Sequence, residues 1–300
     1  MAAWQAERLA LESHFGECIT LDALTGPHHK GAQASCPHLP QGPPSPPSSE
    51  EPLQDDAGSA ATWLIAQRKC GHRHSVDDVL TAWYALQVSP QVAAHLDLGT
   101  GIGSVGLLTL WGMGPGARLT CVEAQEISYR LLQANIERNR LQQRVDASLA
   151  DLRSFTTDRK FPLITGSPPY FPQGSGVLPQ DSQKAHARFE LRGDVADYAV
   201  AAARLLEPAG YLVLCFPSRQ KQRAIAGIAA SGLQITRQRD VIPRETLEPL
   251  FTLFACQIPT ASSTGPPQLE PPFVVRHESG VLTEAMKAVQ RSFGFGAQEL

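Results

Sequence analysis

The 300-residue sequence has no apolar run long enough to cross a membrane and no pair of cysteines at C-x-x-C spacing. Its six cysteines are scattered, which argues against a disulfide framework and favours reduced thiols. Cys121 and Cys215 lie in apolar stretches, where cysteine behaves as a small hydrophobic residue. Early acids at Glu7, Glu12 and Glu17 predict neither a signal peptide nor a transit peptide. We therefore expect a cytoplasmic protein.

An excess of basic residues is also lacking. The chain has 26 Lys and Arg against 29 Asp and Glu, a net charge of -3. Binding of nucleic acid depends on neutralised phosphates, so any such contact needs a local cluster of basic side chains. The close residues His72, Arg73 and His74 make a poor ligand set by themselves, so no metal site is predicted.

A Pro-rich segment divides the chain. Seven prolines fall between Pro37 and Pro52 without any apolar period, which predicts a disordered insertion over residues 26–60. It separates an N-terminal helix and strand segment, residues 1–25, from a main domain over residues 61–300. The flanks, residues 18–22 and 62–67, are each typical of a strand, and together they can form one small hairpin with the insertion at its end.

The main domain alternates strand and helix. Ser75 is a plausible N-cap for a first helix, and Thr283 for a last one. Alternation of this kind predicts an α/β fold of the Rossmann-like type, with a mostly parallel seven-stranded sheet and helices on both faces. Strands are expected over 92–98, 118–123, 144–149, 161–165, 211–216, 250–258 and early in 273–296, and helices over 76–86, 103–110, 127–139, 194–206 and late in 273–296.

A glycine loop, Asp97-Leu98-Gly99-Thr100-Gly101-Ile102-Gly103, follows the first of these strands. The run from Gly101 also satisfies the G-x-G-x-x-G pattern of dinucleotide-binding dehydrogenases. A pyrophosphate requires a positive helix N-terminus, which the carboxylate of Asp97 opposes, whereas S-adenosylmethionine carries an ammonium and a sulfonium. The loop therefore favours S-adenosylmethionine as the cofactor. Glu123 is predicted to accept hydrogen bonds from its ribose hydroxyls, and Asp151 from its adenine amine. The predicted cofactor-binding residues are Asp97, Gly99, Thr100, Gly101, Gly103, Glu123, Asp151 and Ser167.

The tetrapeptide Ser167-Pro168-Pro169-Tyr170 follows a predicted strand, about seventy residues after the glycine loop. Proline fixes φ and restricts the residue before it, so the carbonyls are held in one direction. The Ser167 hydroxyl and the Pro168 carbonyl can then accept hydrogen bonds from an exocyclic amine, while Tyr170 stacks on the ring. A Pro-Pro turn without function is the alternative for this tetrapeptide alone. Beside the glycine loop, the pattern predicts an amine-methylating site with Ser167, Pro168, Pro169 and Tyr170 as its catalytic residues.

The chain resembles the bacterial-type tRNA (adenine-N6) methyltransferases that act on the purine beside the anticodon of a valine tRNA. The resemblance covers most of residues 62–295. The segments of this sequence that carry the resemblance are QRKCGHRHSVD over 67–77, the glycine loop, Ser167 to Phe171, and AHARFE over 185–190. It implies a class I methyltransferase that uses S-adenosylmethionine and acts on RNA. Phe171, Lys184, His186 and Arg188 are the expected substrate-binding residues.

Two features depart from that family. Its members usually carry Asn where this chain has Ser167, and Ser at that place is found in cytosine-N4 enzymes, so both adenine and cytosine stay open. The Pro-rich insertion is also atypical. Protein-glutamine N5 methyltransferases share the Pro-Pro-Tyr clamp but usually have an N-terminal helical bundle that these first sixty residues do not predict. A catalytically silent RNA-binding or partner protein of the same fold is a further alternative.

Overall fold

The computed structural model describes residues 9, 12–13, 19–25, 62–260 and 265–295. The predicted insertion over 26–60 and most of the N-terminal segment lie outside these residues. The expected hairpin is confirmed, because β1 (Ile19–Ala23) pairs antiparallel with β2 (Leu64–Arg68). The main-chain N–H of Leu24 donates to the carbonyl of Trp63 at 2.8 Å, so the two ends of the connection between β1 and β2 lie side by side.

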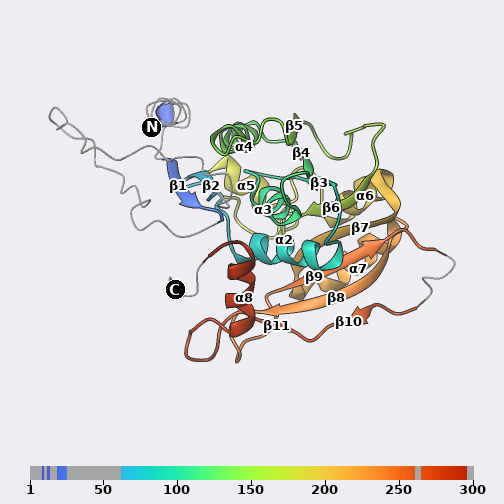
Figure 1. Cartoon of the computed structure of the whole chain (residues 1–300). Helices are drawn as coiled ribbons and strands as arrows, with labels where there is room; N and C mark the ends of the chain where they lie inside the picture. The colour runs from blue at the N-terminus through green and yellow to red at the C-terminus, as the bar shows by residue number, and fades with distance from the viewer. Residues whose placement is uncertain (1–8, 10–11, 14–18, 26–61, 261–264, 296–300) are drawn as a thin grey trace.

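The main domain is built around one twisted sheet, whose strands run in the order β10-β8-β9-β7-β6-β3-β4-β5, with β11 also paired to β8 (Figure 1). Its central pairs from β5 to β7 are parallel, and β9 pairs antiparallel with both β7 and β8. The strands are β3 Ala94–Leu98, β4 Arg118–Glu123, β5 Val145–Leu149, β6 Phe161–Gly166, β7 Leu206–Pro217, β8 Gln234–Ile242, β9 Phe251–Gln257, β10 Gln268–Leu269 and β11 Phe273–Val274. The predicted α/β fold with a mostly parallel sheet is thus confirmed, but the sheet has nine strands and not seven, because β8 and β10 were not among the predicted strands.

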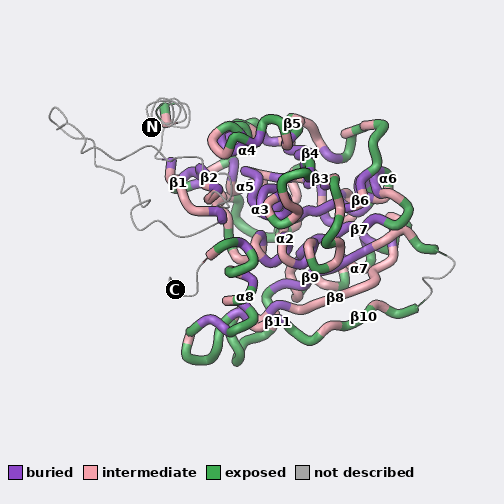
Figure 2. The backbone as a smooth tube through the Cα atoms, viewed as in Figure 1, coloured by how far each residue is buried: buried purple, intermediate pink, exposed green. Residues whose placement is uncertain are grey.

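Helices cover both faces of the sheet, as the sequence predicted. One apolar core joins α2, α3 and α4 to one face, and a second joins α6 and α7 to the other. Burial is continuous through the central strands, while the loops at the rim are exposed (Figure 2). The helices are α2 Val76–Val88, α3 Ser104–Met113, α4 Glu126–Arg138, α5 Ser182–Arg188, α6 Val195–Leu205, the short η1 Ser218–Gln220, α7 Lys221–Ala230 and α8 Glu284–Ser292.

Two differences from the predicted elements concern the strands of the sheet. The helix expected to stop before Pro208 does end at Leu205, but β7 begins at once at Leu206, and the register with β6 shifts there. The strand β8 was not predicted, because arginine side chains take the places on its packed face where a strand pattern would have apolar residues. The Arg239 guanidinium lies 5.5 Å from the ring centre of Trp83 and Arg237 lies 5.6 Å from that of Tyr84, so these long side chains cover aromatic surface that an apolar residue would otherwise cover.

Candidate functional site

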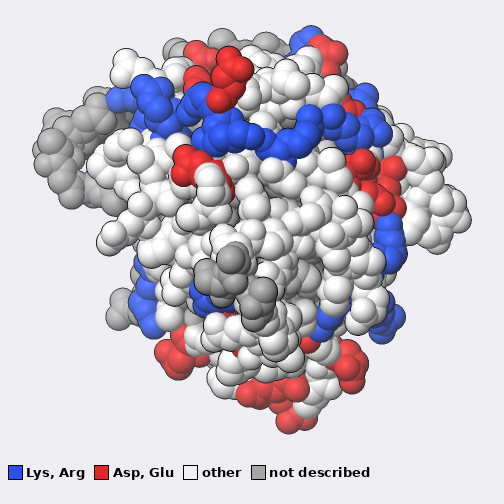
Figure 3. Space-filling model, turned by 90° about the vertical axis from the view of Figure 1, so that its right-hand side faces the viewer, with Lys and Arg blue, Asp and Glu red and all other residues white. Residues whose placement is uncertain are grey.

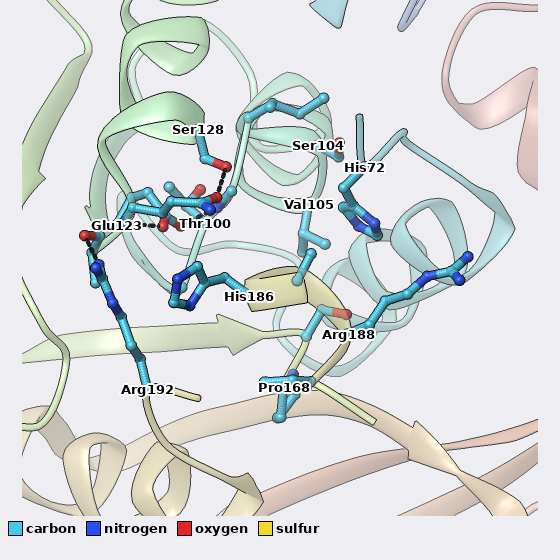
Figure 4. A pocket seen from close by; sticks show the side chains of 18 of the residues that line it. His72, Thr100, Ser104, Val105, Glu123, Ser128, Pro168, His186, Arg188 and Arg192 are labelled. Atoms are coloured by element: carbon cyan, nitrogen blue, oxygen red, sulfur yellow. Dashed lines mark hydrogen bonds between the residues drawn. The ribbon is translucent and has the colours of Figure 1, made fainter. Parts of the chain in front are cut away.

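A cavity of about 400 Å³ opens at the carboxyl ends of β3, β4 and β6 (Figure 4). Open α/β sheets bind their ligands at this edge. The glycine loop and the clamp meet here because β3 and β6 are neighbouring parallel strands, with Leu98 paired to Gly166. Gly99 and Ser167, the next residue of each strand, therefore leave the sheet side by side.

The glycines of the loop are required by its path. Gly99 and Gly101 both have φ of +60°, in the left-handed region. A Cβ atom at Gly99 would lie 1.9 Å from the Tyr198 hydroxyl, whereas none of the described atoms outside its immediate neighbours lies within 4 Å of one at Gly101. Gly103, the N-cap of α3, is also left-handed. The cavity lining includes Gly99 and Gly101 but not Gly103, and any side chain larger than hydrogen at Gly99 or Gly101 would require a strained backbone conformation.

Asp97 lies beneath this loop, only 1% exposed. Its two carboxylate oxygens each accept a hydrogen bond at 2.5 Å, one from the Thr100 hydroxyl and one from the Thr165 hydroxyl. Thr165 is held in turn by the Nε2 atom of His95 at 2.7 Å. Burial raises the pKa of Asp97 to about 6, against the opposing effect of these hydrogen bonds. A negative charge at Asp97 is therefore costly, and a cation in the cavity would stabilise it.

Glu123 ends β4 and lines the same cavity. One carboxylate oxygen accepts from the backbone N–H of Gly101 at 2.8 Å, and the other from that of Gln125 at 2.6 Å. Burial raises its pKa, while the two N–H donors lower it. A carboxylate offers about four acceptor positions, so Glu123 keeps free ones for further donors such as vicinal hydroxyls.

Two more acids reach the cavity from the N-terminus of α2. Asp77 and Asp78 lie in the first turn of that helix, and the sequence did not assign them to the site. Asp77 accepts a hydrogen bond from the Tyr170 hydroxyl at 2.8 Å. Burial, and then the neighbouring charge of Asp77, raise the pKa of Asp78 well above its usual range. Four carboxyl groups therefore line one cavity, which favours a cationic ligand and opposes a pyrophosphate.

The clamp residues Ser167, Pro168, Pro169 and Tyr170 all line the same cavity as the glycine loop. The Ser167 hydroxyl lies 3.5 Å from the Cys215 thiol, and either group can donate. Burial raises the pKa of Cys215 to about 11, so the thiol is neutral. A serine oxygen has two lone pairs, and at least one stays available whichever way this contact is directed. Ser167 can thus accept from an amine in the cavity.

Two aromatic side chains flank the clamp. Tyr170 packs edge-on against Phe216, with ring centres 6.1 Å apart, and its hydroxyl is held by Asp77. Phe171 is 43% exposed at the cavity and stacks in a tilted arrangement on Phe189, 5.4 Å away. Main-chain hydrogen bonds from Phe171 to Arg188 and from Glu190 to Phe171, at 2.8 and 2.9 Å, join the clamp to the segment after α5.

The helix α5 brings the predicted basic segment to the mouth of the cavity. His186 and Arg188 line it, and Figure 4 shows His186 between Arg192 and Arg188, whereas Lys184 lies outside the lining. The buried Gln183, which the sequence did not single out, fixes this helix: its amide donates to Ser128 at 3.2 Å, and its oxygen accepts from the His72 backbone at 3.3 Å. A buried glutamine in a polar segment carries no signal in the sequence that distinguishes it from a solvated one.

Asp151 is placed differently from Asp97 and Glu123, the other acids predicted to bind the cofactor. Its carboxylate forms a two-point ion pair with Arg153, at 2.6 and 2.9 Å, and this hydrogen bonding lowers its pKa. The cavity lining includes its neighbours Ala150 and Leu152 but not Asp151 itself. The structure therefore does not bring Asp151 together with Asp97 and Glu123, and its contact with an adenine stays a prediction.

Charge is unevenly spread over the surface. In Figure 3, Lys and Arg side chains form a band across the upper half of one face, and acidic side chains gather at its lower edge. The net charge of -3 thus coexists with local basic clusters. In the described part of the chain, no three or more His, Cys, Asp and Glu side chains are grouped to hold a metal ion. Across those same residues, no helix has the length and apolar character needed to cross a membrane.

Comparison with known proteins gives a consistent picture. Residues 74–225 match the family described as the methyltransferase small domain. A tRNA1(Val) (adenine(37)-N6)-methyltransferase of Phocaeicola vulgatus is 27% identical over 193 residues, which is 64% of this chain and 80% of the relative. A protein of the same name from Mannheimia succiniciproducens is 26% identical over 76% of this chain and 90% of its own. A solved structure of a predicted O-methyltransferase from Agrobacterium tumefaciens has a TM-score of 0.56 at 15% identity, over 75% of this chain and all of that one.

Proposed function

The chain belongs to the methyltransferase small domain family, and from this premise we propose that it transfers a methyl group from S-adenosylmethionine to the N6 amine of adenine in a tRNA. Relatives of 26–27% identity bear the name of that activity. The observation that carries the proposal is the register of β3 and β6, which sets the glycine loop beside the amine clamp in one cavity.

The cavity fits this cofactor. Its four carboxyl groups suit a ligand with an ammonium and a sulfonium, and a buried carboxylate with free acceptor positions at the end of β4 suits a ribose diol. Asp97 would lie toward the cationic groups, Glu123 would accept from the ribose hydroxyls, and Gly99 and Gly101 would leave room for the ligand against the loop. When bound, S-adenosylmethionine supplies an electrophilic methyl group.

The clamp would position the acceptor amine. Ser167 Oγ and the Pro168 carbonyl accept its two N–H groups and draw the nitrogen lone pair out of conjugation with the ring. Orientation of this kind, together with fixed dipoles, supplies most of the acceleration in such a transfer. Tyr170 would form one wall for the base, with its ring held in place by Asp77 and Phe216. The amine proton becomes acidic as the new bond forms, so no strong base is needed in the cavity.

An RNA substrate agrees with the basic side chains at the cavity mouth. His186 and Arg188 line the opening, and Arg188 is exposed. Arg192, also exposed, donates to the carbonyl of Ala124 beside Glu123. Such groups can contact the phosphates that flank a base inserted between the clamp and the glycine loop.

The test uses labelled S-adenosylmethionine with separate pools of tRNA, rRNA, DNA and peptide, followed by mass spectrometry of the digested nucleosides. We expect N6-methyladenosine in the tRNA pool alone. Detection of N4-methylcytosine would show that the acceptor base is cytosine and not adenine. Detection of methylglutamine in the peptide pool would show that the substrate is a protein and not a nucleic acid. Absence of transfer to all pools, with S-adenosylmethionine bound, would favour the catalytically silent alternative.

A further inference from the structure

The loop that follows the clamp, residues 171–180, carries an unusual concentration of exposed apolar side chains. Val177 is 94% exposed and Leu178 is 49% exposed, and Phe171 at the start of the loop is 43% exposed. Water-exposed aliphatic side chains that cluster beside a cavity mark a binding surface more often than single scattered ones do. No contact described within this protein accounts for the tip of the loop, defined here as Val177 and Leu178.

The two roots of this loop are fixed. On one side, Phe171 is paired by two main-chain hydrogen bonds to the segment after α5, and the Gln173 amide donates to the Glu190 carbonyl at 2.9 Å. A turn closed by Ser175, whose N–H and hydroxyl both donate to the Pro172 carbonyl, follows at once. On the other side, Asp181 caps α5 by accepting from the Lys184 N–H at 2.9 Å. An apolar tip on anchored roots is suited to being inserted into a partner.

The residues at the root of the loop indicate the kind of partner. Phe171 and Phe189 form an aromatic pair at the cavity edge, and Arg188 is exposed beside them. Aromatic faces next to a cation are the usual platform for unstacked bases and their phosphates. Apolar side chains inserted between bases are a common means of opening a base stack. A base that enters the cavity must first leave its stack.

We propose that Val177 and Leu178 act as a wedge that fills the place of the target base in the stack of a structured RNA loop while that base occupies the cavity. The inference rests on the proposed function and deepens it, because it names stacked loops of folded RNA as the substrate class. In this arrangement the wedge contacts only the neighbours of the target base. It therefore favours entry of the base without taking part in methyl transfer.

The test compares two RNAs of identical loop sequence, one folded as a hairpin and one linear and unstacked, in single-turnover assays. For Val177→Ser with Leu178→Ser, we expect about a tenfold or greater loss of methylation rate on the hairpin, the size of one lost stacking contact, and an unchanged rate on the linear RNA. The conservative double variant, Val177→Ile with Leu178→Met, should methylate the hairpin at the rate of the unaltered protein. Leu269→Ser and Val281→Ser, at sites 71% and 56% exposed and distant in sequence from the clamp, are the matched controls and should change neither rate.

A second readout follows the base itself. With 2-aminopurine at the target position of the hairpin, binding of the unaltered protein should raise the fluorescence, and the double serine variant should bind without that rise. Equal rates for variant and unaltered protein on the hairpin would overturn the wedge, as would an equal loss on both RNAs. If the unaltered protein self-associates and the double serine variant is monomeric, the tip forms a contact between protein copies and the wedge is overturned. Failure of the unaltered protein to methylate either RNA would contradict the proposed function rather than the wedge.

Discussion

At the scale of single residues, the site is a chain of buried polar groups that the sequence showed only in part. Asp97 and Glu123 were predicted from their places at strand ends, and both line the cavity. Thr165 and His95 were not predicted, because each lies inside a strand where its side chain has no periodic signal. They hold Asp97 from behind, so the position of that carboxylate is set by hydrogen bonds as well as by the glycine loop.

Asp97→Asn should raise stability while weakening cofactor binding. Because the pKa of Asp97 in the folded protein is raised from 3.8 to about 6, its contribution to stability is fully present below about pH 4 and is lost as the pH rises through about 6. The ionised form therefore costs on the order of 3 kcal/mol at about pH 7.5. We expect the thermal midpoint of the variant to exceed that of the unaltered protein by several degrees at about pH 7.5, and by less at about pH 4.5.

The measurement is the difference between the two melting temperatures at each pH, which removes the effect of other titrating groups. S-adenosylmethionine should stabilise the unaltered protein by mass action and the variant far less, and NAD should stabilise neither. A difference in melting temperature that is the same at both pH values would contradict the assigned cost of the buried charge. Stabilisation by NAD alone would contradict the cofactor assignment.

Ser167→Ala should slow methyl transfer far more than it weakens cofactor binding. Its hydroxyl is predicted to accept from the amine mainly in the transition state, so we expect about a 10- to 100-fold lower single-turnover rate. Ser167→Asn offers an acceptor at the same strand end and should keep a measurable rate. The matched control is Ser218→Ala, whose hydroxyl contacts Thr252 at 3.0 Å at the end of β7. A Ser167→Ala variant with the unaltered rate would move the amine contact to another residue.

At the scale of elements, the sequence predicted those whose pattern is local. The strand β4 is observed with the predicted bounds, and Thr283 caps α8 because its hydroxyl accepts a hydrogen bond from the Met286 N–H. The helices α5 and α7 were not predicted. In α5, burial of Gln183 and Ala185 depends on contacts made across the chain, with Arg68 and Ser128 among them. Elements that are stabilised by such distant partners leave little trace in their own residues.

The connection between β1 and β2 should be replaceable. Thr25 and Trp63 already meet across the hairpin, since the Trp63 N–H donates to the Thr25 hydroxyl at 3.0 Å. We therefore expect a chain in which a short Gly-Ser turn replaces residues 26–60 to fold with a similar melting temperature and to keep its methyl transfer to an RNA hairpin. Calorimetry and the transfer assay test this, with the full-length chain as reference. Loss of folded, cofactor-binding protein would assign a structural role to the segment.

At the scale of the whole molecule, the edge of the sheet explains why so much of the site was predictable. Motifs distant in sequence converge because parallel strands end at one edge, so the loop after β3, Glu123 and the clamp needed only the strand order to be placed together. Asp151 shows the limit of this reasoning. It follows β5 at the same edge, yet its carboxylate pairs with Arg153 and lies outside the cavity lining, and only the structure reveals that partner.

The charge of the whole molecule leads to a last prediction, on the salt dependence of tRNA binding. Since the chain is net acidic, affinity must come from local cations, and Lys184 and Arg188 lie on the helix at the cavity mouth. Each phosphate contact that is removed lowers the slope of log affinity against log salt by about one. The double variant Lys184→Gln, Arg188→Gln should therefore bind tRNA at least about tenfold more weakly at low salt. Its slope should be shallower by about two, because two phosphate contacts are lost.

Affinity of this double variant for S-adenosylmethionine should stay the same. Arg130→Gln, which removes a surface cation paired with Glu126 on α4, is the matched control and should leave the slope unchanged. An unaltered slope in the double variant would show that the phosphates are held elsewhere, and the band of basic side chains in Figure 3 would then be the next surface to neutralise.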